Sequence, residues 1–270
     1  MDRIVAVNSN CYHKYSIEDA IEGAARAGFH YIELTATKGW TEHVFPNMSF
    51  EYLCGVKSRL AAFGLEPIAL SGHTNLMDPN RAHDFINNIK LAAFFGCTYI
   101  VSSIGEAHIE DKAAAADETS ARHIREFVPY LDDYGLTLAL ETHGEHSTGR
   151  RMKSIVEMAG SGRVMINYDT ANVIFFANAD LESDLGDCID SVGFMHIKDK
   201  AGSPDEWNFP ALGAGYVDFP MIFRQLEAER NECPMSVEIE FGPGGSSNLE
   251  EVNEAVRASY EYLSDIGVNI

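Results

Sequence analysis

The sequence predicts a (β/α)₈ barrel, and three observations lead to this fold class. The chain has 270 residues, which is about the length of one such barrel. Eight short apolar runs alternate with longer helical patterns along the whole chain, at an average spacing of about 34 residues, the size of one strand-plus-helix unit. The G-x-G-x-x-G turn typical of an open, doubly wound sheet does not follow the first apolar run, where Asn8-Ser-Asn-Cys stands instead.

The expected strands are continuously apolar or alternate with small residues. This pattern is typical of a sheet that helices cover on one face and that packs on itself inside a barrel. The predicted strands are Ile4–Asn8, Tyr31–Thr35, Pro67–Ser71, Tyr99–Ser103, Thr137–Thr142, Val164–Asp169, Val192–Ile197 and Ser236–Phe241.

Capping residues at their starts and glycines at their ends predict the helices between these strands. The first opens at Ser16, has acids in its first turn and ends at Gly28, as a capped helix does. A capping-box match, Ser247-x-x-Glu250, precedes a last helix that runs to about Ile266. Glycines also follow three further predicted helices, Ser49–Phe63, Arg81–Phe95 and Asp117–Tyr134. No linker or composition break interrupts the pattern, so we expect a single domain over residues 1–270.

The composition excludes several classes of protein. The chain has 20 Lys and Arg against 41 Asp and Glu, a net charge of −21, which repels a nucleic-acid backbone. Hydrophobic residues make up 46% of the sequence, too many for a disordered acidic tail. No apolar run reaches the roughly 18 residues of a membrane span, and the start resembles no signal peptide. The five scattered cysteines form no C-x-x-C pair, so we interpret them as buried thiols and expect a cytoplasmic location.

Polar residues collect where the last four strands are expected to end, which is where barrels place their chemistry. The endings read Leu-Glu141-Thr-His143, Asn167-Tyr-Asp169-Thr-Ala-Asn172, His196-Ile-Lys198-Asp and Val-Glu238-Ile-Glu240. Side chains alternate along a strand, so one residue from each ending would point to the same spot on the barrel axis: Glu141, Asp169, His196 and Glu240.

This set predicts a metal site. Three carboxylates cannot all be ionised in an apolar barrel without compensation, and a divalent cation supplies it. Oxygen ligands with one imidazole favour Mn²⁺ or Mg²⁺, with Co²⁺ or Zn²⁺ as alternatives. Taken singly, each acid could instead be a helix cap or a surface charge. Glu238 could be a structural partner of Lys198 or of a buried arginine.

Other polar residues at the same end are candidate substrate contacts, each with a structural alternative. His73 and His108 follow the third and fourth strands and would otherwise be ordinary loop residues. His143 either supports a ligand or contacts substrate. Lys198 either donates to a substrate oxygen or forms a salt bridge.

Aromatic and glycine-rich loops complete this end of the predicted barrel. The loop containing Trp40, and Trp207 after the seventh strand, are either hydrophobic lids or packed loops. The glycine-rich turn beginning at Gly242 follows the eighth strand, where barrels often bind phosphate. It contains no basic residue, so we interpret it as a simple turn.

Together the four strand endings resemble the xylose isomerase-like TIM-barrel superfamily, over essentially the whole chain. The segment Leu212-Gly-Ala-Gly-Tyr-Val-Asp-Phe is also similar to a G-x-G-x-V-D-F segment of its sugar isomerase/epimerase branch. The resemblance implies a Mn²⁺ or Mg²⁺ site in which two glutamates are also the catalytic acid/base pair, Glu141 and Glu240. It implies a keto-sugar or polyol-ketone isomerase or epimerase that transfers a proton through a metal-stabilised enediolate.

Differences from the family pattern limit which substrates and which members of the superfamily the sequence can match. Epimerases of the tagatose and psicose type tend to have a histidine at the position of Asn172, which we retain as a candidate substrate contact. They also tend to have an arginine soon after the metal histidine, where this chain has Lys198-Asp-Lys. A simple ketohexose is therefore not the expected substrate. A zinc endonuclease of the same superfamily is excluded, since Asn172 replaces a zinc ligand and the net charge opposes DNA binding.

Two alternatives remain open at the level of sequence. A lyase, whether a dehydratase, an oxo-glycoside lyase or a decarboxylase, would begin with the same metal enolate. A non-catalytic sugar-binding barrel would use the same loops without turnover. We expect a small-molecule sugar as the partner, with no nucleic acid and no membrane, and the resemblance allows a homo-oligomer.

Overall fold

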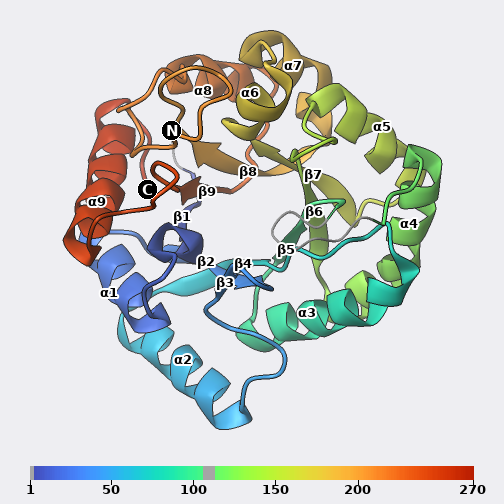
Figure 1. The fold of residues 1–270 in the computed structure, drawn as a ribbon, viewed down its shortest axis with the longest axis horizontal. Coiled ribbons are helices and arrows are strands. Elements are labelled where there is room, and N and C mark those ends of the chain that lie inside the picture. The colour runs from blue at the N-terminus through green and yellow to red at the C-terminus, as the bar shows by residue number, and fades with distance from the viewer. Residues whose placement is uncertain (1–2, 106–112) are drawn as a thin grey trace.

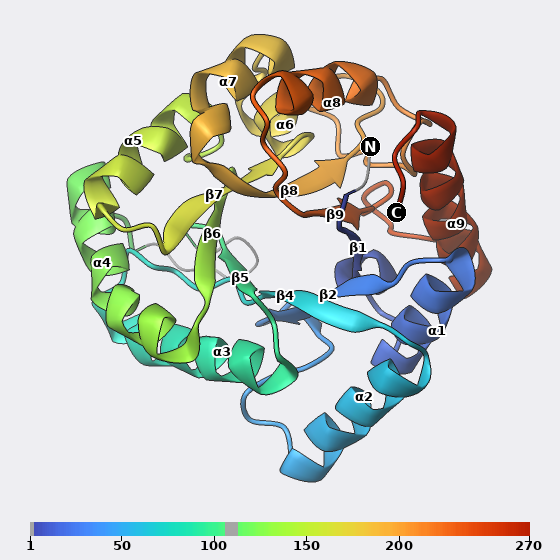
Figure 2. The same cartoon turned by 180° about the vertical axis from the view of Figure 1, so that it is seen from behind.

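The structure is a computed structural model that describes residues 3–105 and 113–270, and it confirms the predicted (β/α)₈ barrel. Parallel strands are hydrogen-bonded in the order β1-β9-β8-β7-β6-β5-β4-β2, and a further pairing between β1 and β2 closes the cylinder. The helices form a ring around the strands when the molecule is seen from either side (Figures 1 and 2). The carboxyl ends of all these strands therefore meet at one end of the barrel.

The barrel strands lie close to their predicted positions. Their bounds are β1 (Val5–Asn8), β2 (Tyr31–Thr37), β4 (Glu66–Ser71), β5 (Tyr99–Ser102), β6 (Thr137–Glu141), β7 (Val164–Asp169), β8 (Val192–Lys198) and β9 (Met235–Glu238). A short strand that was not predicted, β3 (Thr41–Glu42), comes from the loop of Trp40 and pairs antiparallel with the end of β2.

The last barrel strand is shorter than predicted. It ends at Glu238, whereas the sequence pattern continued to Phe241. Beyond it, the backbone N–H groups of Glu240 and Phe241 donate to the carbonyl of Phe209, in the loop after β8. Phe241 also has a φ of 60°, which is not a strand conformation. A contact with a distant loop therefore takes the chain out of the barrel sheet.

Helices surround the barrel, and several were not individually predicted. Ser16 and Asp19 form a capping box at the start of α1, and Gly28 ends that helix in a left-handed conformation, as expected. The start of α9 differs from the prediction by one residue, because Asn248 is the N-cap and accepts from the N–H of Glu251. The bounds are α1 (Ile17–Ala27), α2 (Phe50–Ala62), α3 (Ala82–Phe95), α4 (Asp117–Tyr134), α5 (Gly149–Ala159), α6 (Asn172–Ala177), α7 (Leu181–Cys188), α8 (Phe219–Ala228), α9 (Leu249–Asp265) and the 3₁₀ turns η1 (Ser9–Tyr12), η2 (Pro79–Arg81) and η3 (Ile189–Ser191).

The interior of the barrel is a small core separate from the larger one between strands and helices. It consists of strand residues: Ala6, Ile68, Ala69, Val101, Ala139 and Phe194. Phe194 precedes His196 by two residues on β8, and the two ring centroids are 6.0 Å apart. The apolar interior of the barrel therefore packs directly beneath the polar residues at the carboxyl ends of the strands.

The described part of the chain has no helix that is both long and apolar enough to cross a membrane. The five cysteines are free thiols. Four of them are buried as predicted, but Cys54, on α2, is half-buried.

Candidate metal centre and active site

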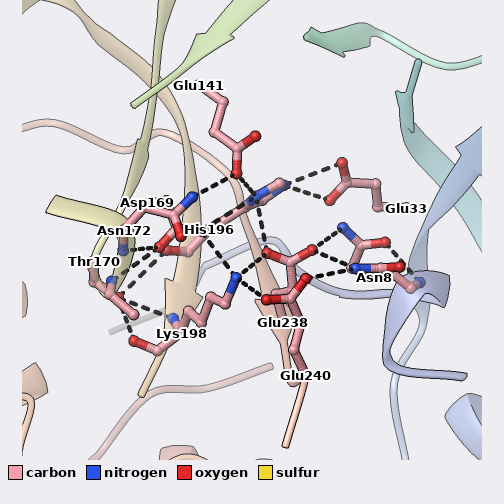
Figure 3. Close-up of polar contacts among 12 residues, drawn as sticks. Asn8, Glu33, Glu141, Asp169, Thr170, Asn172, His196, Lys198, Glu238 and Glu240 are labelled. Carbon is pink, nitrogen blue, oxygen red and sulfur yellow. Dashed lines mark hydrogen bonds and ion pairs between the residues drawn. The ribbon is translucent and has the colours of Figure 1, made fainter. Parts of the chain in front are cut away.

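A cluster of buried ligand-type side chains lies at the carboxyl ends of neighbouring strands. Each member comes from the end of its strand, and one possible ligand atom from each lies within 4.8 Å of the others: Glu141 on β6, Asp169 on β7, His196 on β8 and Glu238 on β9. Figure 3 shows these side chains converging on one point. The structure therefore brings together three of the four residues that the sequence predicted as ligands.

The fourth member of the cluster is Glu238, where the sequence predicted Glu240. Oε2 of Glu238 lies 3.5 Å from Nδ1 of His196. Glu240 lies beside the cluster, with its Oε2 2.7 Å from Nζ of Lys198. Both carboxylates line one cavity, in agreement with the period-two pattern. Because β9 ends at Glu238, however, only that carboxylate reaches the convergence point.

His196 is oriented by an acid that sequence reasoning did not identify. Its Nε2 lies 3.0 Å from Oε2 of Glu33, which is fully buried on β2. Its Nδ1 faces the cluster, 3.1 Å from Oε1 of Glu141. A carboxylate that binds the outer nitrogen of a histidine fixes the ring of a metal ligand in this way. The signal in the sequence is a lone acid inside the apolar run Tyr31-Ile-Glu-Leu.

Asp169 carries a buried oxygen that needs a partner. Its Oδ1 accepts the backbone N–H groups of Ala171 and Asn172, at 2.9 and 2.8 Å. Its Oδ2 is buried and accepts no hydrogen bond from any residue that the structure describes. Burial raises the pKa of Asp169 to about 8, although the nearby Lys198 ammonium lowers it. An unsatisfied carboxylate oxygen that faces other acids is the environment that a cation fits.

The charges around the cluster are unbalanced. Five acidic side chains are buried together, those of Glu33, Glu141, Asp169, Glu238 and Glu240. Lys198 lies among them, with its Nζ 3.3 Å from Oε2 of Glu238 and 4.5 Å from the ring centre of Phe209. Burial disfavours the ammonium, but the acids around it hold its pKa well above the ordinary value. Even with Asp169 holding its proton, because its pKa is about 8, four acids lie against one lysine and one histidine, so a divalent cation fits this donor set.

Glu141 has two neighbours that the sequence placed near substrate. Nε2 of His73 lies 3.4 Å from its Oε2, and Nδ2 of Asn172 donates to its Oε1 at 3.3 Å. The backbone N–H of Ser103 donates to Nδ1 of His73, which leaves the proton on Nε2, facing Glu141. Burial alone would raise the pKa of Glu141, but His73 and His196 hold it well below its ordinary value.

A narrow cavity of about 20 Å³ opens above the cluster. Five of the six predicted substrate contacts line it: His73, His143, Asn172, Lys198 and Trp207. His143 packs against Phe176, with ring centroids 4.6 Å apart. Burial lowers the pKa of His143 to about 4, against the opposite effect of Glu141. The sixth predicted contact, His108, lies outside the described residues.

Asn10 connects the cluster to the aromatic loop and was not predicted. Its Nδ2 donates to Oε1 of Glu238 at 3.1 Å, while its Oδ1 accepts the indole N–H of Trp40 at 2.9 Å. It lies in the 3₁₀ turn that follows β1. Neutral amides at such positions have weak sequence signals, because a polar turn after a strand explains them equally well.

Comparisons with known proteins agree with this architecture. An L-ribulose 3-epimerase superimposes with a TM-score of 0.76 at 18% identity, over 98% of this chain and 94% of the other. A D-allulose 3-epimerase from Methylomonas sp. gives 0.76 at 17% identity, over 98% of both chains. A xylose isomerase-like TIM barrel protein from Mycobacterium smegmatis, in complex with magnesium, gives 0.74 at 16% identity, over 98% and 97% of the two chains.

These identities are low, so the likeness to solved structures concerns the fold. No curated protein matches the sequence. A family model described as xylose isomerase-like TIM barrel matches residues 21–266, which is most of the chain. The chain therefore belongs to the xylose isomerase-like TIM barrel family.

Proposed function

We propose that the protein is a divalent-metal-dependent isomerase or epimerase of a keto-sugar or polyol-ketone. The observation that carries this proposal is the buried cluster, to which β6 and β9 each contribute a glutamate. Oδ2 of Asp169 accepts no hydrogen bond from the described residues and has only long ion pairs, 3.8 Å from Nζ of Lys198 and 3.9 Å from Nδ1 of His196. The epimerase names of two of the similar structures point to the same class of reaction. A small-molecule sugar is thus the proposed partner, and the cytoplasm the proposed location.

Glu141 and Glu238 are the proposed acid/base pair. Burial raises the pKa of Glu238, but Lys198 and His196 outweigh this effect and hold it below its ordinary value. Both carboxylates are therefore ionised near neutral pH and can accept a proton. One would remove the proton from the carbon next to the carbonyl, and the other would return a proton to that carbon or its neighbour. This assignment replaces the sequence-based choice of Glu240 with Glu238.

A divalent cation held by Glu141, Asp169, His196 and Glu238 would, when bound, stabilise the negative charge that develops on the substrate oxygens. Mn²⁺ and Mg²⁺ are the proposed ions, because three of the four ligands are carboxylates. The reacting end of the sugar would lie over the cluster, and the lining side chains would move apart to admit it, since the cavity of about 20 Å³ has room for little more than one water molecule. The lining of this cavity supports the substrate contacts named from the sequence, including Asn172 and Lys198.

Proton transfer to and from carbon can be tested in deuterated water. With Mn²⁺ present, a panel of keto-sugars and polyol-ketones that includes a 6-O-glucosylated ketose beside the simple ketoses D-allulose and L-ribulose is incubated with the protein, and carbon-bound deuterium is followed by NMR. We expect deuterium next to the carbonyl in a product isomeric with the substrate, and we expect EDTA to abolish the exchange and Mn²⁺ to restore it.

Three results would contradict the proposal. Loss of water, carbon dioxide or an aglycone from a substrate would indicate a lyase. Sugar binding without any exchange would indicate a binding protein. Exchange that persists in a sample shown to be metal-free would remove the role of the cluster.

A further inference from the structure

A second, wider cavity adjoins the cavity above the cluster of Glu141, Asp169, His196 and Glu238. It has a volume of about 310 Å³, at the lower end of the range for small-molecule pockets. Asn10, Trp40, Trp207 and Glu240 line both cavities. We call this wider space the distal cavity. The two cavities are therefore neighbours, and a ligand whose reacting end lies over the carboxylates would reach the distal cavity past these shared side chains.

The aromatic rings of the distal cavity are held in fixed positions. Trp40 stacks on His13, with ring centroids 4.0 Å apart and an interplanar angle of 11°, while Asn10 accepts its indole N–H. Trp207 packs edge to face against Phe175 and Phe209, at 5.6 and 5.1 Å. Such rings offer rigid apolar surfaces whose electron-rich faces attract polarised C–H groups. Both tryptophans of the chain line this cavity.

Polar groups also line the distal cavity. The hydroxyls of Tyr15 and Ser246 lie 3.3 Å apart and both residues line the space. Each hydroxyl can donate one hydrogen bond and accept others. The cavity thus combines two indole surfaces with hydroxyl groups, which matches a molecule that has an apolar face and a polar edge.

The charges of the distal cavity do not favour an anion. Lys14 is exposed, and its Nζ donates to the carbonyl of Gly244 at 3.4 Å. The carboxylate of Glu240 lines the same space but is paired with Lys198, so it adds little repulsion. At the start of α9, Asn248 and Glu251 already accept backbone N–H groups that a phosphate would need. A neutral ligand is therefore favoured over a phosphate group.

We propose that the distal cavity binds a pyranose ring, so that the substrate is a ketose carrying a glycosyl group at the end remote from its carbonyl. A pyranose has C–H faces that pack on indoles and a rim of hydroxyls that hydrogen-bond, and it is uncharged. This inference rests on the proposed function for the reacting end.

The test compares a ketose with its 6-O-glucosyl derivative, in which the fructose unit is restricted to its furanose and open-chain forms. D-Fructose and 6-O-α-D-glucopyranosyl-D-fructose (isomaltulose) are titrated into the Mn²⁺-loaded protein, and the Kd is taken from tryptophan fluorescence. The two tryptophans of the chain line both the distal cavity and the cavity above the cluster, so the signal reports binding of either sugar, and the glycine variants below locate the second ring. We expect the glucosylated ketose to bind about tenfold or more tightly, which corresponds to about 1.4 kcal/mol.

A matched pair of glycine substitutions locates the second ring. Gly242 lines the distal cavity, and a Cβ added there would meet no described atom within 4 Å. Gly162, between α5 and β7, is equally open and does not line it. We expect Gly242→Leu to reduce the Kd ratio between the two sugars by about tenfold, whereas Gly162→Leu leaves it as in the unmodified protein. Circular dichroism checks that both variants are folded.

The outcomes separate this inference from the proposed function. A glucosylated ketose that binds no more tightly than the free ketose, or that is unaffected by Gly242→Leu, overturns the pyranose site. Tighter binding of D-fructose 6-phosphate than of the glucosylated ketose also overturns it, in favour of an anion site. If the glucosylated ketose binds with the expected preference but neither sugar exchanges a proton in deuterated water, the distal cavity stands and the proposed function fails.

Discussion

At the scale of single residues, Glu238 and Glu240 are separated by one residue but have different environments. Glu238 belongs to the buried cluster, whereas Glu240 forms an ion pair with Lys198. Burial raises the pKa of Glu240, and Lys198 opposes this effect. The two side chains are two positions apart in the sequence, so no pattern of residue types alone separates their roles.

Substituting each of these acids in turn tests the assignment. We expect Glu238→Gln to lower kcat by about 10²–10⁴-fold, because it removes a proton-transfer group. We expect Glu240→Gln to keep measurable turnover but to destabilise the fold, since it leaves Lys198 with one partner fewer. Steady-state kinetics and thermal unfolding measure both effects. An inactive Glu240→Gln enzyme beside an active Glu238→Gln enzyme would restore the sequence-based choice.

Glu33 is expected to act through His196. Glu33 touches His196 but does not line the cavity above the cluster. We expect Glu33→Gln to weaken Mn²⁺ binding by about 10–100-fold, as loss of an outer carboxylate partner does. Equilibrium dialysis with metal analysis measures the affinity, and Glu66→Gln, at an exposed position on β4, is the control. Equal Mn²⁺ affinities in the two variants would show that Glu33 has only a structural role.

At the scale of elements, the helix and strand ends that the sequence predicted correctly are determined by residues nearby in the chain. The helix start at Ser16 and its end at Gly28 are local signals and were found where expected. The capping box predicted at Ser247 and Glu250 was wrong by one residue, because Asn248 is the N-cap of α9. The end of β9 depends on Phe209, which is far away in sequence, and it was predicted three residues too late. Three of the four members of the buried cluster were predicted because strand endings are local signals. Asn10 and Glu33 were missed because their partners lie on other strands.

The packing of α1 against η1 and α9 leaves no room for a methyl group at Gly23. A Cβ there would overlap the hydroxyl of Tyr12 and lie 2.5 Å from Oδ1 of Asn253, which are themselves hydrogen-bonded at 3.1 Å. We expect Gly23→Ala to lower the free energy of unfolding by about 1–3 kcal/mol, measured by urea denaturation.

Gly55 provides the matched control for Gly23. It lies inside α2, and a Cβ added there would meet no described atom within 4 Å. Alanine is the better helix former, so Gly55→Ala should raise the free energy of unfolding by about 0.5–1 kcal/mol. A destabilisation of the same size in both variants would mean that the close packing around Gly23 is not what limits it.

At the scale of the whole molecule, the polar end of the barrel is expected to limit stability in the absence of metal. The clustered acids repel one another, and a cation that binds the folded state stabilises it by mass action. At a Mn²⁺ concentration of about 100 times the Kd, the gain is about 2.7 kcal/mol, or roughly 5–10 °C in Tm for a chain of this size. Thermal unfolding with Mn²⁺ and with EDTA measures it. The shift should be lost in Glu238→Gln, and an equal shift in that variant would place the ion elsewhere.

Barrel closure also has a consequence for the order in which the chain folds. Val5 of β1 pairs with Met235 of β9, 230 residues later in the chain. At a synthesis rate of about 5–20 residues per second, β1 leaves the ribosome roughly 10–50 s before this partner is made. Glu238 lies on that last strand, while Glu33 lies on β2 and Asn8, whose Nδ2 donates to Oε1 of Glu238 at 3.3 Å, lies on β1. The nascent protein therefore spends most of its synthesis with an open sheet and an incomplete cluster, and both are completed only when the last strand arrives.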